Sequence, residues 1–218
     1  MATLSGTVQR AAAGLAGFDV NQVLSASQAQ EFKNAGYDFC IRYIPRHEGS
    51  STGNLTFDEA TAILNAGLAL MAVQHVANPG WAPTADLGTA YGSYAATWCS
   101  DQVGLPPGVN VWLDLEEVAT DSAPADVIAY CQAWYTAVNA AGYVPGIYIG
   151  WGVVLDGNEL YNDLSFQHYW RAYNDDTIVA TRGFQLKQTD QKTLGTVTFD
   201  PNTSQEDNLG GTPFWLAL

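Results

Sequence analysis

Apolar, β-branched and aromatic runs alternate along the chain with stretches whose apolar residues recur at helical spacing. Eight runs have the length and composition of β-strands, and they lie at residues 15–20, 37–44, 68–76, 109–116, 144–150, 168–174, 183–189 and 195–200. Helical patterns separate the earlier runs, at 25–36, 55–67, 84–102 and 123–142. Strands that alternate with helices at this spacing predict a parallel sheet.

Eight such units in one chain of this length predict an α/β fold, a TIM-like (β/α)8 barrel. Only eight residues separate the sixth and seventh strands, and five separate the seventh and eighth. A parallel crossover needs about a dozen residues. We therefore expect an irregular second half with missing helices, in which the last strand can run antiparallel. The alternative is an open doubly wound sheet, but no GxGxxG follows the first strand.

No linker or change of composition divides the chain, so we expect residues 1–218 to form one barrel domain, with 1–14 as a flexible N-terminal segment. The three cysteines have no metal-binding spacing and are interpreted as buried free thiols, with a Cys99–Cys131 bridge left open. No apolar stretch approaches the ~20 residues of a membrane span. The N-terminus carries one basic residue and does not resemble a signal peptide.

Acidic residues dominate the charge, with 22 Asp and Glu against 8 Lys and Arg, which gives a net charge of −14. Nucleic acids and anionic membranes bind clustered Lys and Arg, so both are excluded as partners. The basic residues are scattered along the sequence and predict no basic patch.

Four acids fall at the predicted ends of three strands. Asp114 and Glu116 share one face at the end of the fourth strand, while Asp19 ends the first strand and Asp200 the last. The carboxyl ends of barrel strands carry the active site. Each acid alone is explained equally well as a strand-end cap, but two acids on one face of a buried strand are costly without a purpose.

Crowded carboxylates raise at least one pKa, as a general acid near neutral pH requires. Two carboxyl groups with divided roles cleave glycosidic bonds, although the same cluster could bind Mg²⁺ or Ca²⁺. Aromatic side chains that could stack on sugar rings lie on or just after strands, namely Trp112, Tyr148, Trp151, Trp170 and Tyr173. Trp151 and Trp170 are the better candidates for the rim, and Trp112 for the core. His75 is a candidate to line the site, with packing as its simpler explanation, and no zinc-binding spacing occurs.

The acids occur in the segments GFDVNQ, LDLEE and TFDPNT, and between them lie YWRAYN and GFQLKQ. In this order the segments resemble the motifs of family 25 glycoside hydrolases, the N-acetylmuramidase lysozymes, over residues 16–203. The phrases AGYDFCIRYI, LTFDEATAILNAGLAL and NAAGYVPGIYIG resemble even more closely a related group, the glycoside-hydrolase-like domains of largely unassigned activity. Within YWRAYN the resemblance selects Trp170 and Tyr173, and within GFQLKQ it selects Gln185.

The resemblance implies that Glu116 is the proton donor and that Asp114 is its ionised partner. Asp19 and Asp200 would shape the site and keep Glu116 protonated. The implied substrate is the β-1,4 bond of peptidoglycan, cleaved at the cell wall without a cofactor or metal. A phage lysin or a secreted antibacterial effector would fit, with delivery machinery and an immunity protein as partners. A non-catalytic glycan-binding barrel and a glycosidase of another polysaccharide are the alternatives.

Overall fold

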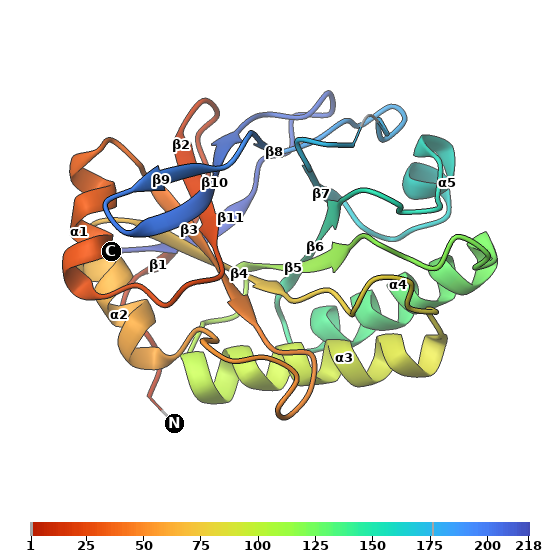
Figure 1. The fold of residues 1–218 in the computed structure, drawn as a ribbon, viewed down its shortest axis with the longest axis horizontal. Helices are drawn as coiled ribbons and strands as arrows, with labels where there is room; N and C mark the ends of the chain where they lie inside the picture. Colours follow the sequence, from red (N-terminus) through yellow and green to blue (C-terminus); the bar gives the residue numbers. More distant parts are fainter. Residues whose placement is uncertain (1, 176) are drawn as a thin grey trace.

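A closed ring of eight strands forms the centre of the protein, whose computed structural model describes residues 2–175 and 177–218 (Figure 1). The ring consists of β2 (Ala16–Val20), β3 (Phe39–Ile44), β4 (Ala69–Gln74), β5 (Asn110–Leu115), β6 (Val144–Ile149), β7 (His168–Arg171), β8 (Leu186–Gln188) and β10 (Val197–Ser204). Each of these strands overlaps one of the eight predicted runs. The TIM-like barrel predicted from the alternating pattern is therefore confirmed.

The strands β2 to β8 pair in parallel in the order of the sequence. β10 closes the ring and is antiparallel to both neighbours, with Asn202 opposite Gln188 on β8 and Asp200 opposite Asp19 on β2. The short connection before the last strand thus predicted its direction correctly. A parallel strand there would have needed a longer crossover.

Three further strands lie outside the ring. β1 (Thr7–Arg10) pairs antiparallel with β11 (Phe214–Ala217), and β11 joins β4 through the pairing of Leu216 with Leu70. β9 (Lys192–Leu194) forms a hairpin with β10. We expected residues 1–14 to be a flexible segment, but the structure places Thr7–Arg10 of this segment in a sheet. The partner strand is 204 or more residues away in sequence, so no local pattern announced the pairing.

Four helices of nine or more residues cover the first half of the barrel, namely α1 (Ala26–Asn34), α2 (Phe57–Asn65), α3 (Ala85–Trp98) and α4 (Pro124–Ala140). A π-helical turn, η1 (Cys99–Val103), continues α3. Ser25 caps α1 in a capping box, and Thr56 accepts the Glu59 N–H at the start of α2. In the second half, among the described residues, only the six-residue α5 (Gly157–Asn162) remains. The missing helices explain the short connections.

Two glycines allow α3 to pack closely against α4. A Cβ atom at Gly88 would lie 2.2 Å from the Tyr130 carbonyl oxygen, and one at Gly92 would lie 2.7 Å from that of Trp134. The two helices lie side by side beneath the barrel in Figure 1. These glycines, which weaken the helical pattern of the sequence, are therefore packing residues.

Large aromatic side chains fill the barrel. Trp112 and Trp170 meet edge to face with 5.8 Å between ring centroids, and the Trp112 indole donates to the Met71 sulfur. The three cysteines are free and buried, as expected. No helix within the described part of the chain is long and apolar enough to cross a membrane. The barrel interior is therefore a packed core, and the carboxyl ends of its strands are where an active site is expected.

Candidate active site

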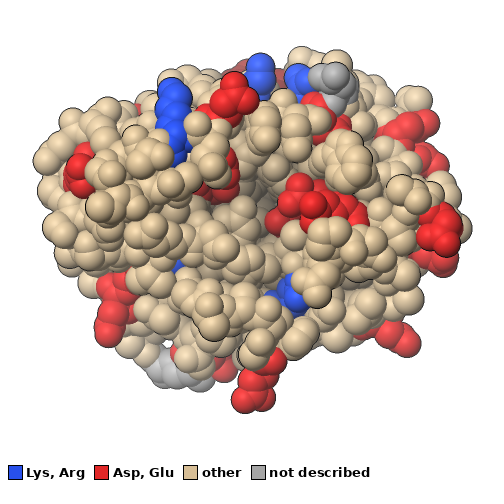
Figure 2. Space-filling model, in the orientation of Figure 1, with Lys and Arg blue, Asp and Glu red and all other residues tan. Residues whose placement is uncertain are grey.

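The structure brings the four predicted acids together at one end of the barrel. Asp19 and Asp114 lie near the carboxyl ends of β2 and β5, Glu116 follows β5 directly, and Asp200 lies opposite Asp19 on β10. Burial is the main cause of their raised pKa values. The charges of Glu116 and Asp19 add to the raised pKa of Asp114, and the charge of Asp200 adds to those of Asp19 and Glu116. Figure 2 shows a hollow near the centre of this face, with acidic side chains at its right-hand edge.

Asp19 is a buried carboxyl group that accepts three hydrogen bonds. Its Oδ2 accepts from Gln188 Nε2 at 2.9 Å and from Asn202 Nδ2 at 2.7 Å, and its Oδ1 accepts from the Tyr43 hydroxyl at 3.2 Å. The side chain is only 1% exposed. Burial raises its pKa to about 7 despite these donors, and Asp200 adds to the effect. Asp19 therefore holds its proton up to neutral pH.

Two aromatic side chains orient the amides that contact Asp19. The Tyr148 hydroxyl donates to Gln188 Oε1 at 2.9 Å, and Trp170 Nε1 donates to Asn202 Oδ1 at 2.7 Å. Each amide oxygen is thereby occupied, so each amide nitrogen faces Asp19. The network joins β2, β6, β7, β8 and β10 and fixes the geometry of this side of the site.

Sequence reasoning missed Gln188 and Asn202, although both lie in motifs that it used. Asn202 follows Asp200 by two residues in TFDPNT, and Gln188 ends GFQLKQ. The resemblance selected Gln185 from that motif instead. Gln185 is also buried, but its described hydrogen bonds join it to the Tyr169 backbone N–H, the Gln167 carbonyl and the Asp207 carboxylate. It therefore lies in a different network from the acids.

Asp114 is more deeply buried than Glu116, the acid that shares its strand end. It is 4% exposed, its Oδ1 has no hydrogen-bond partner, and the Val76 backbone N–H is the donor to the carboxyl group. Burial, and then the charges of Glu116 and Asp19, raise its pKa well above the usual range. The ionised Asp114 that the resemblance implies therefore stays a prediction, and burial opposes it. In the protein without ligand, this carboxyl group resists ionisation because it is out of contact with water.

Glu116 is partly exposed, as is Asp200, whereas Asp19 and Asp114 are buried, so a substrate can reach Glu116. Burial, and then the charges of Glu117 and Asp200, raise its pKa to about 7. A carboxyl group with this pKa is protonated in a large fraction of molecules at neutral pH. Glu116 therefore has the accessibility and the proton that a general acid needs.

Hydrogen bonds from two neighbouring loops hold the turn after β5 in place. The Glu117 N–H donates to the Trp151 carbonyl, and the Glu117 carbonyl accepts from the Gly80 N–H, both at 2.8 Å. The Trp81 indole donates to the Glu116 carbonyl at 2.9 Å. Glu117 has a φ of 53°, a conformation that costs roughly 1 kcal/mol or more and persists where surrounding contacts impose it. The backbone that carries Glu116 is consequently rigid.

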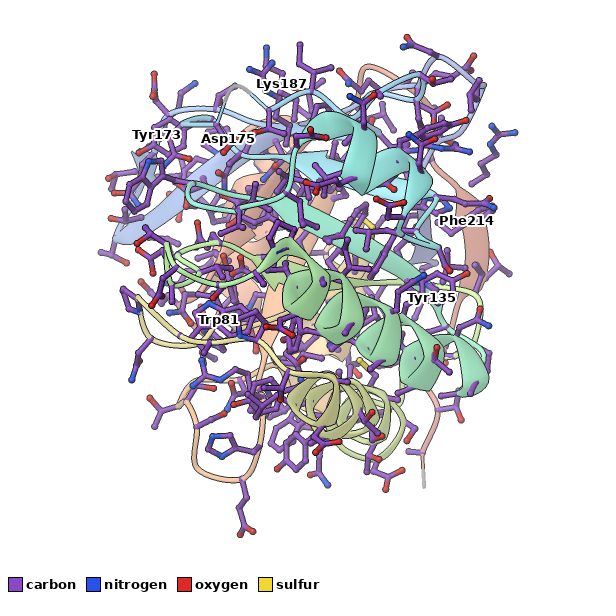
Figure 3. All side chains as sticks on the ribbon, turned by 90° about the vertical axis from the view of Figure 1, so that its right-hand side faces the viewer. Trp81, Tyr135, Tyr173, Asp175, Lys187 and Phe214 are labelled. Atoms are coloured by element: carbon purple, nitrogen blue, oxygen red, sulfur yellow. The ribbon has the colours of Figure 1, made fainter. Side chains whose placement is uncertain are left out.

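The predicted aromatic residues divide between the rim and the interior. Trp151 is 61% exposed and borders a hollow formed with Glu117 and Asp121, and Tyr173 is 54% exposed. Figure 3 shows Tyr173 and Trp81 towards the same side of the molecule, the side that faces the viewer in Figures 1 and 2. Trp170, expected at the rim, is buried beneath the acids, as is Tyr148. Their polar atoms hydrogen-bond Asn202 and Gln188, which explains why they point inward.

His75 lies beside the site and contacts it through Tyr43. The two rings are 4.6 Å apart, and His75 Nε2 is buried without a hydrogen-bond partner. Burial, followed by the charges of Arg46 and Arg42, lowers the pKa of His75 to about 4, so the ring is neutral at neutral pH. Within residues 2–175 and 177–218, no three or more His, Cys, Asp and Glu side chains form a group that could hold a metal ion.

A barrel with several carboxyl groups at the mouth of its strands is an arrangement that glycoside-hydrolase-like domains share with other barrel proteins. The chain belongs to the family of Rv2525c-like, glycoside hydrolase-like domains, whose model matches residues 30–204. A comparison with curated proteins finds no match.

Solved structures with this fold include members of both groups that the sequence resembles. The Tat-secreted protein Rv2525c of Mycobacterium tuberculosis, in complex with L-tartrate, is 17% identical with a TM-score of 0.65, over 88% of this chain and 95% of that one. The muramidase of Trichobolus zukalii is 16% identical, with a TM-score of 0.60 over 85% and 92% of the two chains. The lysozyme of Streptomyces coelicolor is 16% identical, with a TM-score of 0.61 over 88% and 92%. At these identities the likeness shows the fold.

Proposed function

We propose that the protein is a peptidoglycan hydrolase that cleaves β-1,4 glycosidic bonds of the bacterial cell wall, with Glu116 as the proton donor. The observation that carries this proposal is the pairing of a partly exposed Glu116, whose pKa is raised to about 7, with the buried Asp114 on the same strand end. Two carboxyl groups in different environments are the usual means of dividing acid and partner roles in glycoside cleavage.

In the proposed reaction, Glu116 gives its proton to the glycosidic oxygen as the bond from that oxygen to the anomeric carbon breaks. The leaving sugar departs as an alcohol, and positive charge develops on the remaining sugar. A hydrogen bond donated by the substrate to the unpartnered Oδ1 of Asp114 favours its ionised form, and the proton of Asp114 passes to the solvent as the substrate binds. The positive charge that develops on the sugar then stabilises the ionised carboxylate. Water then adds to the anomeric carbon and releases a proton, which restores Glu116.

The proposed substrate indicates where the protein acts, because peptidoglycan lies outside the cytoplasmic membrane. The structurally similar protein of M. tuberculosis is Tat-secreted, and other neighbours are a lysozyme and muramidases. By this analogy the protein acts at the cell wall, in the extracellular or periplasmic space. Secretion or phage machinery would deliver it, and an effector of this kind would require an immunity protein in the producing cell.

The test is digestion of purified peptidoglycan, followed by an assay of new reducing ends and mass spectrometry of the fragments. Glu116→Gln and Asp114→Asn each preserve the shape of the side chain and are expected to abolish product formation. Asp126→Asn removes an exposed charge from the first turn of α4, outside the hollow beside Trp151, and serves as the matched control, expected to retain activity. No new reducing ends from the wild type, or equal release by Glu116→Gln, would show that the proposal is wrong.

A glycan-binding barrel without hydrolysis is the second candidate, favoured by the exposed Trp151 and Tyr173 on the rim. Aromatic faces of this kind would hold a sugar whether or not a bond is cut. In this case, incubation with defined oligosaccharides would return them intact, and Trp151→Ala would weaken their retention. If the protein cleaves a different polysaccharide and leaves peptidoglycan intact, the proposed chemistry stands and only the assigned substrate changes.

A further inference from the structure

Two adjoining hollows lie at the end of the barrel opposite the acids. They have volumes of about 180 and 170 Å³ and share Gln167 and His168, which lie at the amino-terminal end of β7. Tyr135 of α4 borders one hollow, and Phe214 of β11 borders the other. Figure 3 shows both aromatic residues on the side of the molecule away from Trp81 and Tyr173. The hollows are therefore separate from the candidate active site.

The larger hollow is basic in a protein that is strongly acidic. Arg10 and Arg182 both line it, and these are two of only eight Lys and Arg residues in a chain of net charge −14. The two residues are 172 positions apart in sequence. The scattered Lys and Arg residues did not predict a basic patch, but the fold brings these two together. A concentration of positive charge against the overall field of the molecule favours an anionic ligand at this position.

Neutral hydrogen-bond acceptors hold the side chain of Arg10 in place. Its Nε donates to Thr212 Oγ1 at 3.0 Å, and its Nη2 donates to the Gly210 carbonyl. Both acceptors are uncharged, so they orient the guanidinium group without neutralising its charge. The planar guanidinium group has five N–H donors, which leaves donors for an oxyanion.

Arg182 is held from the other side of the hollow by a buried carboxylate. Arg182 Nη1 lies 2.7 Å from Asp207 Oδ2, and Asp207 also accepts hydrogen bonds from the backbone N–H groups of Leu209 and Gly211. Asp207 thereby shapes the loop that contributes Gly211 and Thr212 to the hollow, while it is not among the lining residues itself. One carboxylate against two guanidinium groups leaves a net positive charge.

His168 forms the boundary between the two hollows. It is 9% exposed, its ring lies 5.8 Å from that of Phe214, and its Nδ1 is buried without a hydrogen-bond partner. An unpaired buried nitrogen costs free energy unless a ligand or water serves it. Burial, and then the charge of Arg182, lower the pKa of His168 to about 4, so the ring is neutral at neutral pH.

We propose that the basic hollow binds an oxyanion, a carboxylate or a phosphate group, between Arg10 and Arg182. The second hollow, which shares Gln167 and His168 with the first, leaves room for the remainder of a larger ligand. Guanidinium groups match the geometry of both oxyanions and bind them through charge-assisted hydrogen bonds. This site is independent of the proposed hydrolase activity, because no residue of the acid cluster contributes to it.

The test is titration of the whole protein with inorganic phosphate and, separately, with acetate, at an ionic strength held constant with chloride. Histidine resonances assigned with His168→Gln report the local effect, and calorimetry reports the affinity. We expect a saturable shift of the His168 signals with at least one anion. Tighter binding of phosphate assigns a phosphoryl ligand, and tighter binding of acetate assigns a carboxylate.

Arg10→Gln is expected to weaken the binding about tenfold, which is about 1.4 kcal/mol, because it removes a charge-assisted hydrogen bond to the anion. Lys187→Gln, which removes an exposed cation from β8, is the matched control and leaves the affinity unchanged. Should Arg10→Gln fail to fold, Arg10→Lys keeps the charge without the planar fork and is expected to weaken binding as well. A shift that does not saturate with either anion, or equal weakening by Lys187→Gln, would overturn the proposal.

Discussion

Replacing Asp19 with Asn is expected to stabilise the protein at pH 8 and to leave its stability nearly unchanged at pH 4. The substitution fits the existing hydrogen bonds. Asp19 Oδ2 accepts from Gln188 and Asn202, so the single oxygen of an Asn side chain can take that position. The Asn nitrogen then faces the Tyr43 oxygen, which can accept a hydrogen bond.

The magnitude follows from the pKa of Asp19, which is raised from 3.8 to about 7 in the folded protein. Between these pH values the folded state binds more protons at this group than the unfolded state does. Folding stability therefore falls as the pH rises from about 4 through 7. A shift of about three units, at 1.36 kcal/mol per unit, corresponds to about 4 kcal/mol above pH 7. Asn carries no ionisable group, so the variant avoids this cost.

Urea unfolding of the wild type and of Asp19→Asn between pH 4 and pH 8 measures the effect. The difference in unfolding free energy should grow steadily with pH and approach a few kcal/mol at pH 8. Asp121→Asn, at an exposed position, is the control and should change stability by less than about 0.5 kcal/mol. A difference that does not depend on pH, or an Asp19→Asn variant that is less stable at pH 8, would refute the reasoning. An acid that lowers stability at neutral pH is expected at a functional site.

Three further predictions concern the core, the helix packing and the acid cluster. Glu59→Gln breaks the buried ion pair with Arg42 (2.7 Å) and should lower the unfolding free energy by ~3–5 kcal/mol, measured by denaturation. Gly88→Ala places a Cβ against the Tyr130 carbonyl and should lower the melting temperature, with a cost of ~1–3 kcal/mol. Initial rates on peptidoglycan should fall as the pH rises through about 7, because Glu116 then loses its proton; rates that continue to rise above pH 8 would contradict this.

Strand positions and barrel closure were predictable because their signals are local. Each predicted run became a strand of the ring, and connection length alone anticipated the direction of β10. The pairing of β1 with β11 was not predictable, because its partners come from opposite ends of the sequence and the strands are only four residues long. Short strands carry little periodicity, and their pairing is decided by tertiary contacts.

The acids of the site were accessible to sequence reasoning, whereas their hydrogen-bond partners were not. Carboxyl groups at strand ends are conspicuous, but Gln188 and Asn202 are amides that also occur in ordinary turns and strand edges. Their importance depends on the register of β8 against β10, which places them opposite each other. Trp170 likewise looks like a rim residue in the sequence, and only the position of Asn202 explains why its indole is buried.

The position of Asp200 shows how strand direction determines a site. Asp200 was predicted at the mouth as the last residue of a strand, an argument that holds only if the strand is parallel to its neighbours. β10 is antiparallel, so its later residues run away from the mouth, towards the start of β2. Asp200 nevertheless lies opposite Asp19 because the strand continues for four residues beyond it, to Ser204. The same reversal places Asn202 one step deeper, where it can reach the Asp19 carboxyl group and accept from Trp170. An antiparallel closing strand therefore supplies the site with a carboxyl group near the surface and a neutral amide below it. Burial and the charge of Asp200 raise the pKa of Asp19, whereas the hydrogen bond from Asn202 lowers it.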